Sequence, residues 1–257
     1  MTTTQSLPTA QTPDAAHARP RCLVIVPAFN ESESIDRVVR GLVRELPHAD
    51  VAVIDDGSTD QTARHVPPGA LLISLPFNLG IGGAMQTGYR YAFMHGYATA
   101  VQVDADGQHP PDQARKLIDR LSESGADMVI GSRFLEESGY RQGPLRMMGQ
   151  CVLSGLLRLL TGRRFTDCTS GFRACNRRVI SAFAHWYPDD YPEPEVVLLL
   201  HRSGFRVEET AVTMQPRTTG QTSIPLHRGV FYVIKVSAAL LLDMIRKPWP
   251  KGKVDLP

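Results

Sequence analysis

Cysteine is scarce in this sequence, and the cysteines present lack the spacing of metal or redox pairs. The 257 residues include four of them, Cys22, Cys151, Cys168 and Cys175, with no C-x-x-C arrangement. No apolar N-terminal run of the secretory kind precedes them. We therefore expect four reduced, structural thiols in a cytosolic setting rather than a disulfide framework.

Two familiar nucleotide-binding loops and a long apolar span are also missing. Neither G-x-G-x-x-G nor a P-loop sequence occurs, which disfavours a dinucleotide-binding or P-loop enzyme. The most apolar run, Gly229–Ile245, is interrupted by Lys235 and Asp243 and falls short of the ~20 apolar residues of a membrane span. Three readings of this run stay open: a helix in the membrane interface, a helix buried in the domain or an oligomer, and a span.

Charge is unevenly distributed along the chain, although the net charge is only +2. Residues 1–128 hold 10 Lys and Arg against 15 Asp and Glu, and residues 129–257 hold 18 against 11. The basic half uses mainly Arg, whose planar fork suits phosphate. The asymmetry favours an anionic partner for the second half, with an ordinary solvated surface as the alternative.

The hydrophobic pattern predicts a tail, an α/β domain and a C-terminal helix. Residues 1–20 lack apolar periodicity and are predicted to be a disordered tail. From Arg21 to Gly131, strand-like runs alternate with helical spacing, which is typical of a doubly wound, mostly parallel sheet. We expect the domain to cover residues 21–224, and an apolar helix with a basic tail to cover residues 225–257. The predicted strands are Cys22–Val26, Val51–Ile54, Leu71–Ser74, Thr99–Val103, Met128–Gly131 and Phe205–Val212. The predicted helices are 35–46, Gly82–Met94, Asp112–Ser122, Leu145–Leu160, a helix ending at Val196–His201, and Gly229–Ile245; a short helix is also expected after Asp56.

Polar side chains follow the predicted strands. In such sheets ligands bind beyond the carboxyl ends of the strands, so these residues are candidates for a site. They are Asn30, Asp55, Asp56, Asn78, Asp104 and Asp106. Asn30, followed by Glu33, is also predicted to cap the first helix.

Asp104-Ala105-Asp106 has the most definite chemistry. Two carboxylates two residues apart at a strand end can point towards one ion, and hard oxygen ligands suit Mg²⁺ or Mn²⁺. Such a metal would bridge the carboxylates and a substrate diphosphate. Gln108 can add an oxygen ligand, whereas His109, followed by two prolines, is expected to be a loop residue. Without other motifs, a solvated turn would be the better explanation of the pair.

Three other segments can be read as ligand-binding, and two of them also have a structural reading. Asp55-Asp56-Gly57-Ser58 can bind a ribose or base, or form a type I turn. Asn78–Gly83 places glycines at a helix start, where anions bind. Arg217–Ser223 can close over a phosphate or be an ordinary surface loop.

Taken in order, the motifs resemble family-2 glycosyltransferases of the GT-A type, and within them polyprenyl-phosphate sugar synthases similar to dolichol-phosphate mannose synthase. The matching text is VIVPAFNES, VAVIDDGSTD, NLGIGGAMQTG, VQVDADGQHPP, MVIGSRF, TDCTSGFRA and PRTTGQTS. The resemblance extends from about Arg21 to about Ile224. It implies a GT-A fold, with a Rossmann-like, mostly parallel sheet flanked by helices and an amphipathic or interfacial C-terminal helix.

The resemblance also implies site residues. Asp104, Asp106 and Gln108 would hold the metal, and Asp106, Arg133 and Glu195 would act at the reacting centre. Asp167 and Ser170–Arg173 match a segment near the acceptor. The acceptor phosphate would be held by Arg133, Arg146 and Ser170. The nucleotide sugar would be bound by Pro27, Phe29, Glu31, Ile54, Asp55, Asp56, Gly83, Asp104, Ala105, Asp106 and Arg217.

The implied reaction is inverting transfer of a hexosyl or N-acetylhexosaminyl group from a nucleotide diphosphate sugar to a polyprenyl phosphate, for cell-envelope glycan or glycoconjugate synthesis. A lipid phosphate is already ionised near neutral pH, so positioning and charge compensation would carry catalysis. A saccharide hydroxyl as acceptor would instead need a carboxylate base, such as Glu195 or Asp167. A non-catalytic nucleotide-sugar-binding partner protein is the third alternative.

Two departures from the family pattern shape the remaining expectations. The loop after Arg217 lacks the terminal Lys of R-x-x-G-x-S-K, which favours a UDP-sugar over GDP-mannose as donor. Many relatives carry two or more membrane helices after the catalytic domain, whereas this sequence has only Gly229–Ile245. We therefore expect a peripheral protein at the cytoplasmic face of the membrane, docked by that run, by basic side chains or by a small membrane partner protein, with a homo-oligomer left open.

Overall fold

One mixed sheet forms the centre of the molecule. The computed structural model describes residues 21–135, 144–215 and 226–245, with only the backbone for 144–146 and 226–230. In these residues seven strands pair in the order β3-β2-β1-β4-β6-β5-β7, and β6 runs antiparallel to both of its neighbours while the other pairs are parallel. The strands are β1 (Cys22–Ala28), β2 (Ala49–Asp55), β3 (Leu71–Ser74), β4 (Thr99–Gln102), β5 (Met128–Ser132), β6 (Arg173–Asn176) and β7 (Val207–Ala211).

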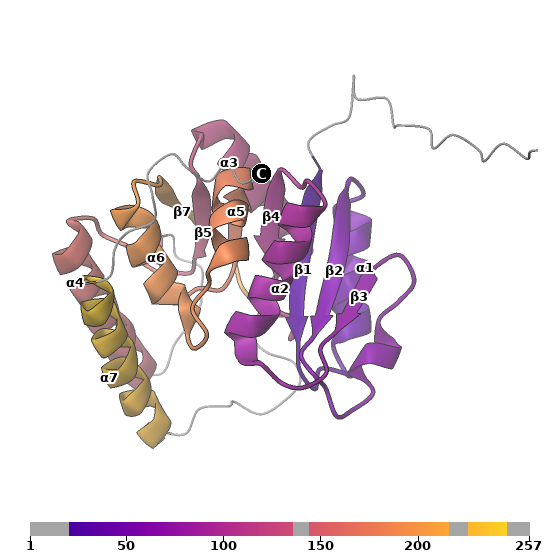
Figure 1. The fold of residues 1–257 in the computed structure, drawn as a ribbon, viewed down its shortest axis with the longest axis horizontal. Coiled ribbons are helices and arrows are strands. Elements are labelled where there is room, and N and C mark those ends of the chain that lie inside the picture. The colour runs from indigo at the N-terminus through magenta and orange to yellow at the C-terminus, as the bar shows by residue number, and fades with distance from the viewer. Residues whose placement is uncertain (1–20, 136–143, 216–225, 246–257) are drawn as a thin grey trace, which may run out of the picture.

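Helices cover both faces of this sheet (Figure 1). Side chains of β1 alternate between two apolar cores, with Leu23 and Ile25 in one and Val24 and Val26 in the other. A central strand buried on both faces needs this continuous apolar run, because successive side chains point to opposite faces. α1 and α3 pack on the second core, and α2, α5 and α6 pack on the first. The helices are α1 (Ile35–Glu45), α2 (Gly80–Met94), α3 (Pro111–Ser124), α4 (Pro144–Thr161), α5 (Arg177–His185), α6 (Pro192–Arg202) and α7 (Leu226–Asp243), with a 3₁₀ turn η1 (Thr62–His65).

The predicted mostly parallel α/β fold is confirmed. Each strand and helix predicted between Cys22 and Gly131 is present, with ends shifted by a few residues, and the short helix expected after Asp56 is η1. The prediction that Asn30 caps α1 is wrong. Asn30 has a φ of +56° and its side chain accepts the N–H of Thr59, while Ser34 occupies the position before the helix.

Strand β6 is the element that the sequence pattern did not predict, and it lies in the middle of the sheet. It has four residues, begins with Arg173 and ends with Asn176, so it lacks the β-branched residues that mark most strands. Because β6 is antiparallel to β4, Arg173 lies opposite Gln102, the last residue of β4. The chain before β6 therefore arrives at the carboxyl end of β4, next to Asp104.

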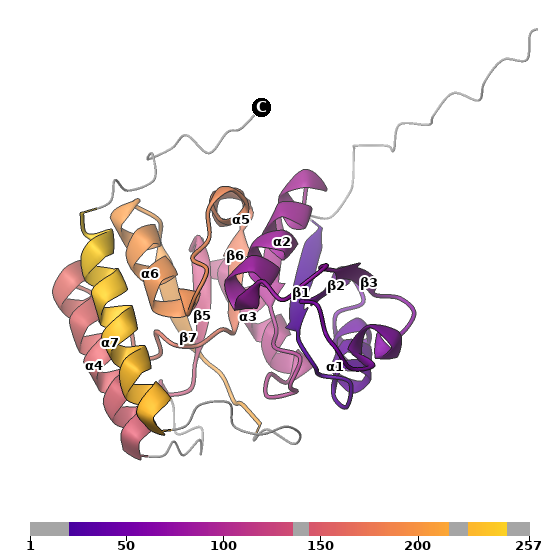
Figure 2. The ribbon, with the colours of Figure 1, turned by 60° about the horizontal axis from the view of Figure 1, so that its bottom comes forward.

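Helices α4 and α7 lie side by side at the edge of the molecule far from β3 (Figure 2). α7 buries Val236 and Leu240 in the core, and a Cβ on Gly149 of α4 would lie 3.0 Å from Val233 of α7. The expected C-terminal amphipathic helix is thus present, and one of its sides is packed against the protein. Within the described ranges, no helix combines the length and apolarity that a membrane crossing requires. The domain limits at residues 20 and 224 stay predictions.

Candidate active site

The candidate site lies where the carboxyl ends of the parallel strands meet. β1 and β2 are in register so that Ala28 lies opposite Asp55, which brings the following loops together. β4 ends beside them, and β5 ends beyond the start of β6. The order of the strands therefore places Asp55, Phe29, Asp104, Gly171 and Arg133 along one edge of the sheet.

The loops after β1 and β2 hold each other in place. Asn30 donates its N–H to Ser58 Oγ (3.0 Å), and its side-chain oxygen accepts from the N–H of Thr59 (2.9 Å). Glu31 donates its N–H to Thr62 Oγ1 (2.8 Å) and accepts from Ser34 Oγ (2.9 Å). These bonds make a fixed wall for the predicted nucleotide pocket, because each loop satisfies polar groups of the other.

The predicted nucleotide-binding side chains differ in their exposure along this wall. Phe29 is 44% exposed, so an aromatic ring is available to a ligand. Pro27 and Ile54 are buried. Gly83 lies in the first turn of α2, where an added Cβ would meet Leu79 at 2.5 Å. Among these residues only Phe29 presents an exposed side chain, and contact with a nucleotide stays a prediction for each of them.

Asp55 and Asp56 hold the local structure through their carboxylates. Both side chains are almost buried. Asp56 accepts the N–H groups of Leu79 (2.8 Å) and Gly80 (2.9 Å), and so binds the first turn of α2; burial raises the pKa of this carboxyl, and those two N–H donors oppose the shift. Asp55 accepts the N–H of Ser58 at 3.1 Å. The predicted type I turn is wrong, because Gly57 has a φ of +69° where such a turn needs a negative φ. Contact with a base or ribose stays a prediction.

His109 contacts both the backbone and the carboxylate of Asp104. The N–H of Asp104 donates to Nδ1 of His109 at 3.0 Å, which places the ring proton on Nε2, and Nε2 lies 3.7 Å from Asp104 Oδ2. The imidazole is buried and stacks on Phe172 with ring centroids 4.3 Å apart. His109 is a loop residue, as expected, but its buried contact with Asp104 had no signal in the sequence.

The residues predicted to hold a metal are close together in the chain and supply suitable oxygens. Asp104 keeps part of its side chain exposed, while Asp106 Oδ1 accepts the N–H of Gln108 at 3.0 Å. A Cβ on Gly171 would lie 3.5 Å from Asp104 Oδ1, so glycine keeps space beside this carboxylate. Two carboxylates and an amide oxygen fit Mg²⁺ or Mn²⁺ when a substrate phosphate supplies further ligands. In the part of the chain that is described, no group of three or more His, Cys, Asp or Glu is arranged to hold a metal ion.

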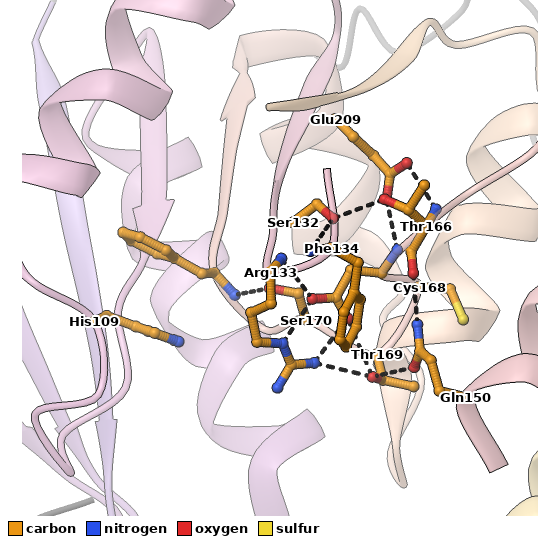
Figure 3. A network of polar contacts seen from close by, with 12 residues as sticks. His109, Ser132, Arg133, Phe134, Gln150, Thr166, Cys168, Thr169, Ser170 and Glu209 are labelled. Atoms are coloured by element: carbon orange, nitrogen blue, oxygen red, sulfur yellow. Dashed lines mark hydrogen bonds and ion pairs between the residues drawn. The ribbon is translucent and has the colours of Figure 1, made fainter. Parts of the chain in front are cut away.

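Arg133 is bound to a buried carboxylate (Figure 3). Its Nε and Nη2 donate to Asp167 Oδ2 (2.6 Å) and Oδ1 (2.7 Å), and Nη2 also donates to Thr169 Oγ1 (3.2 Å). One edge of the predicted phosphate-binding guanidinium therefore faces Asp167. Ser170, predicted on the same acceptor side, is buried, and its Oγ accepts the N–H of Phe172 at 3.3 Å. The side chain of Arg146 and all of Arg217 lie outside the described residues.

Two glutamates of α6 have different surroundings. Glu195, predicted at the reacting centre, lines a cavity of about 540 Å³ together with Arg90, Asp190 and Lys235. Burial raises the pKa of the Glu193 carboxyl, the charge of Arg173 opposes the shift, and smaller effects come from Asp104 and Arg133. The charges of Asp104 and Arg133 thus act on Glu193 as well, and the role predicted for Glu195 stays a prediction.

A buried arginine connects Glu193 to the segment before β6. Arg173 donates to the carbonyl oxygens of Ser170 (2.7 Å), Cys168 (3.1 Å) and Glu193 (2.8 Å). Its Nη1 has no hydrogen-bond partner among the described residues. Arg173 thus ties the loop beside Asp104 to the start of α6, although the sequence suggested only that it belonged to an acceptor-side segment.

Comparison with known proteins decides the family. A model described as glycosyl transferase family 2 matches residues 23–183. The chain belongs to this family. A polyprenol monophosphomannose synthase of Mycolicibacterium smegmatis is 32% identical over 223 residues, covering 80% of this chain and 83% of the relative. A UDP-N-acetylglucosamine–dolichyl-phosphate N-acetylglucosaminyltransferase of Methanococcus voltae is 31% identical, covering 63% and 71%.

The fold of this family-2 glycosyltransferase matches solved structures of the GT-A type. A glucosyl-3-phosphoglycerate synthase of Mycobacterium tuberculosis, in complex with Mn²⁺, UDP and phosphoglyceric acid, aligns with a TM-score of 0.66. The alignment covers 87% of this chain and 78% of that one at 20% identity, so it concerns the fold. The GT-A expectation from the sequence is confirmed.

Proposed function

We propose that this family-2 glycosyltransferase transfers a sugar from a nucleotide diphosphate to a polyprenyl phosphate. The observation that carries the proposal is the order of charges along the sheet edge, with Asp104 and Asp106 after β4 and Arg133 after β5. The reaction brings two anions together, so groups that compensate charge are needed on both sides. The polyprenol monophosphomannose synthase and the dolichyl-phosphate N-acetylglucosaminyltransferase among the relatives support the acceptor class.

The donor half would consist of Asp104, Asp106 and Gln108 with Mg²⁺ or Mn²⁺, and the loops after β1 and β2 would hold the nucleoside. When bound, the metal would neutralise charge on the leaving diphosphate. The Mn²⁺ and UDP of the M. tuberculosis structure support this half. Asp106→Ala is expected to abolish metal-dependent release of the nucleoside diphosphate, and unchanged turnover would refute the metal assignment.

The acceptor half would use Arg133, with Arg146 and Ser170 as predicted helpers. A lipid phosphate oxygen attacks the anomeric carbon as the bond to the diphosphate oxygen breaks, so the configuration inverts. Asp167 is bound to Arg133, which makes it a poor general base for the alternative acceptor, a saccharide hydroxyl. That alternative predicts transfer to a saccharide acceptor, whereas the proposed reaction predicts none. Equal transfer to a phosphate-free polyprenol would refute the role of the acceptor phosphate.

The apolar surface beside this half supports a lipid substrate. Gln150 of α4 bonds to Thr169, which in turn contacts Arg133, so α4 adjoins the acceptor side. α4 and α7 expose many large apolar side chains, and an exposed apolar surface of this kind marks an interaction site. We expect it to lie on the cytoplasmic face of a membrane. These side chains are Met147, Met148, Val152, Leu159, Phe231, Ile234, Leu241 and Leu242, together with Ile245 just after α7.

One experiment tests the proposal and selects the donor. The protein is incubated with Mn²⁺, undecaprenyl phosphate and, separately, UDP-glucose, UDP-N-acetylglucosamine, UDP-galactose or GDP-mannose, and lipid products are identified by mass. We expect a UDP-sugar to be used, although the two relatives above differ in the sugar that their names give. Absence of a lipid-linked sugar with every donor would overturn the proposed function.

A further inference from the structure

The ion pair between Asp167 and Arg133 is more tightly built than a surface salt bridge. The Asp167 side chain is fully buried and that of Arg133 is 14% exposed. Asp167 accepts from the backbone N–H of Arg133 (3.1 Å) as well as from Nε and Nη2, so one carboxylate receives three hydrogen bonds from one residue. Two parallel bonds to a planar guanidinium fix its plane as well as its position.

Strand β7 anchors Asp167 from one side. Glu209 of β7 accepts the backbone N–H of Asp167 at 2.7 Å and that of Thr166 at 2.8 Å. The hydroxyl of Thr166 is bonded to Ser132 Oγ at 2.7 Å, which ties it to the end of β5 just before Arg133. The carboxylate that orients Arg133 is therefore itself held by two neighbouring strands.

Helix α4 holds the same segment from the other side (Figure 3). Gln150 donates to the carbonyl oxygen of Thr166 at 2.9 Å and accepts from Thr169 Oγ1 at 2.7 Å. One amide thus spans residues 166–169, with Asp167 between its two contacts. The Asp167–Arg133 ion pair is therefore held both by strands of the sheet and by α4, which carries part of the exposed apolar surface.

We propose that Asp167 is a positioning residue that sets the orientation of the Arg133 guanidinium for an acceptor phosphate. This inference rests on the proposed function, since it gives Arg133 a phosphate to meet. Asp167 accepts from Nε and Nη2, and Thr169 Oγ1 accepts from Nη2 as well, so the plane of the guanidinium is fixed before an acceptor arrives. Asp167 does not touch the substrate; it limits the directions in which Arg133 can point.

Charge and orientation give opposite expectations for Asp167→Asn. A carboxylate beside Arg133 repels a phosphate, so its removal would strengthen acceptor binding if only charge mattered. If Asp167 orients Arg133, the neutral amide cannot accept both hydrogen bonds from the guanidinium, and the enzyme uses the acceptor less efficiently. We expect kcat/KM for undecaprenyl phosphate to fall by at least about tenfold, with the nucleotide-sugar KM within about twofold of wild type.

The measurement varies undecaprenyl phosphate in detergent micelles at saturating nucleotide sugar, and then varies the donor. Asp127→Asn is the matched control, because Asp127 is also buried, pairs with Arg178 at 2.7 Å and accepts the N–H of Arg206 at 2.8 Å. It precedes β5 at the opposite end of that strand, so its loss is expected to affect unfolding but not acceptor kinetics. In a protein that already carries Arg133→Lys, Asp167→Asn is expected to cause no further loss of acceptor kcat/KM, because there is no guanidinium left to orient.

The outcomes separate this inference from the proposed function. If the wild type makes no lipid-linked sugar, the proposed function fails and the inference falls with it. If the wild type is active and Asp167→Asn keeps or raises acceptor kcat/KM, only the inference is overturned. An equal loss in Asp127→Asn would also overturn it, by showing general destabilisation. If Asp167→Asn does not fold, Thr169→Val replaces it, because it removes the bonds to Arg133 and Gln150. We expect it to lower kcat/KM for undecaprenyl phosphate about threefold. An unchanged kcat/KM would overturn the inference.

Discussion

At the scale of single residues, His109 determines where the backbone of Asp104 lies. His109→Ala removes the acceptor for the Asp104 N–H and the ring that stacks on Phe172. Groups that orient a metal ligand typically contribute 10- to 100-fold to metal affinity. We expect the affinity for the Mn²⁺–UDP complex, measured by isothermal titration calorimetry without acceptor, to fall about tenfold or more.

His95 provides the control for this substitution. It bonds to the carbonyl oxygen of Tyr91 and stacks on the Tyr91 ring, but it lies at the far end of α2 and is exposed. His95→Ala should therefore leave Mn²⁺–UDP affinity unchanged. Unchanged affinity in His109→Ala, with a lowered melting temperature, would reduce His109 to a purely structural residue.

Single residues also show which features of the site local sequence could predict and which it could not. A strand followed by Asp104 was enough to predict that the carboxylates lie at the sheet edge. The partners of Asp56 are 23 and 24 residues further along the chain, so no local pattern indicated that it holds the start of α2. Glu193 and Glu195 share one helical turn, so local sequence could not tell their surroundings apart.

At the scale of elements, Gly82 allows α2 to touch the turn before α6. An added Cβ would lie 2.2 Å from the carbonyl oxygens of Pro188 and Asp189, and the N–H of Gly82 donates to Asp189 O at 3.1 Å. Gly82→Ala must push the two elements apart, since backbone atoms cannot rotate away. We expect a loss of about 1–3 kcal/mol in the free energy of unfolding, measured by urea denaturation.

Gly155 is the matched glycine, because it also lies in a helix but has open space around its Cβ position. Gly155→Ala is expected to stabilise the protein by about 0.5–1 kcal/mol, through the lower flexibility of alanine in the unfolded chain. Equal effects of the two substitutions would contradict the packing argument for Gly82.

Elements with strong periodicity were predictable, and β6 was not. The amphipathic α1 buries Ile35, Val38, Val39 and Leu42 at helical spacing, which local sequence specifies. β6 depends instead on pairing with β4 and β5, which are distant in sequence. Its central Ala174 and Cys175 are buried, but four residues carry too little pattern to reveal a strand.

At the scale of the whole molecule, the position of the two apolar helices could not be predicted from sequence. The spacing of apolar residues predicted a helix in each segment, but not that α4 and α7 would pack together (Figure 2). Both helices also expose large apolar side chains. Cys151 lies exposed on α4 among these side chains. The other cysteines are partly or fully buried, and burial raises the pKa of Cys22 and of Cys168 to about 12, so Cys151 is the thiol most accessible to a maleimide.

This thiol reports whether the apolar surface docks on a membrane. Anionic liposomes containing undecaprenyl phosphate are expected to co-sediment with the protein and to slow maleimide labelling of Cys151, because lipid would cover α4.

Ile234→Glu combined with Leu241→Glu places two charges on the exposed side of α7 and should weaken liposome binding at least tenfold, since burying each apolar side chain is worth about 1.5–3 kcal/mol. Met94→Glu alters an even more exposed apolar residue, at the end of α2, and should have no effect on liposome binding. If liposomes leave the labelling rate unchanged and do not bind the wild type, this surface does not dock on lipid, and a protein partner would have to bring the enzyme to its acceptor.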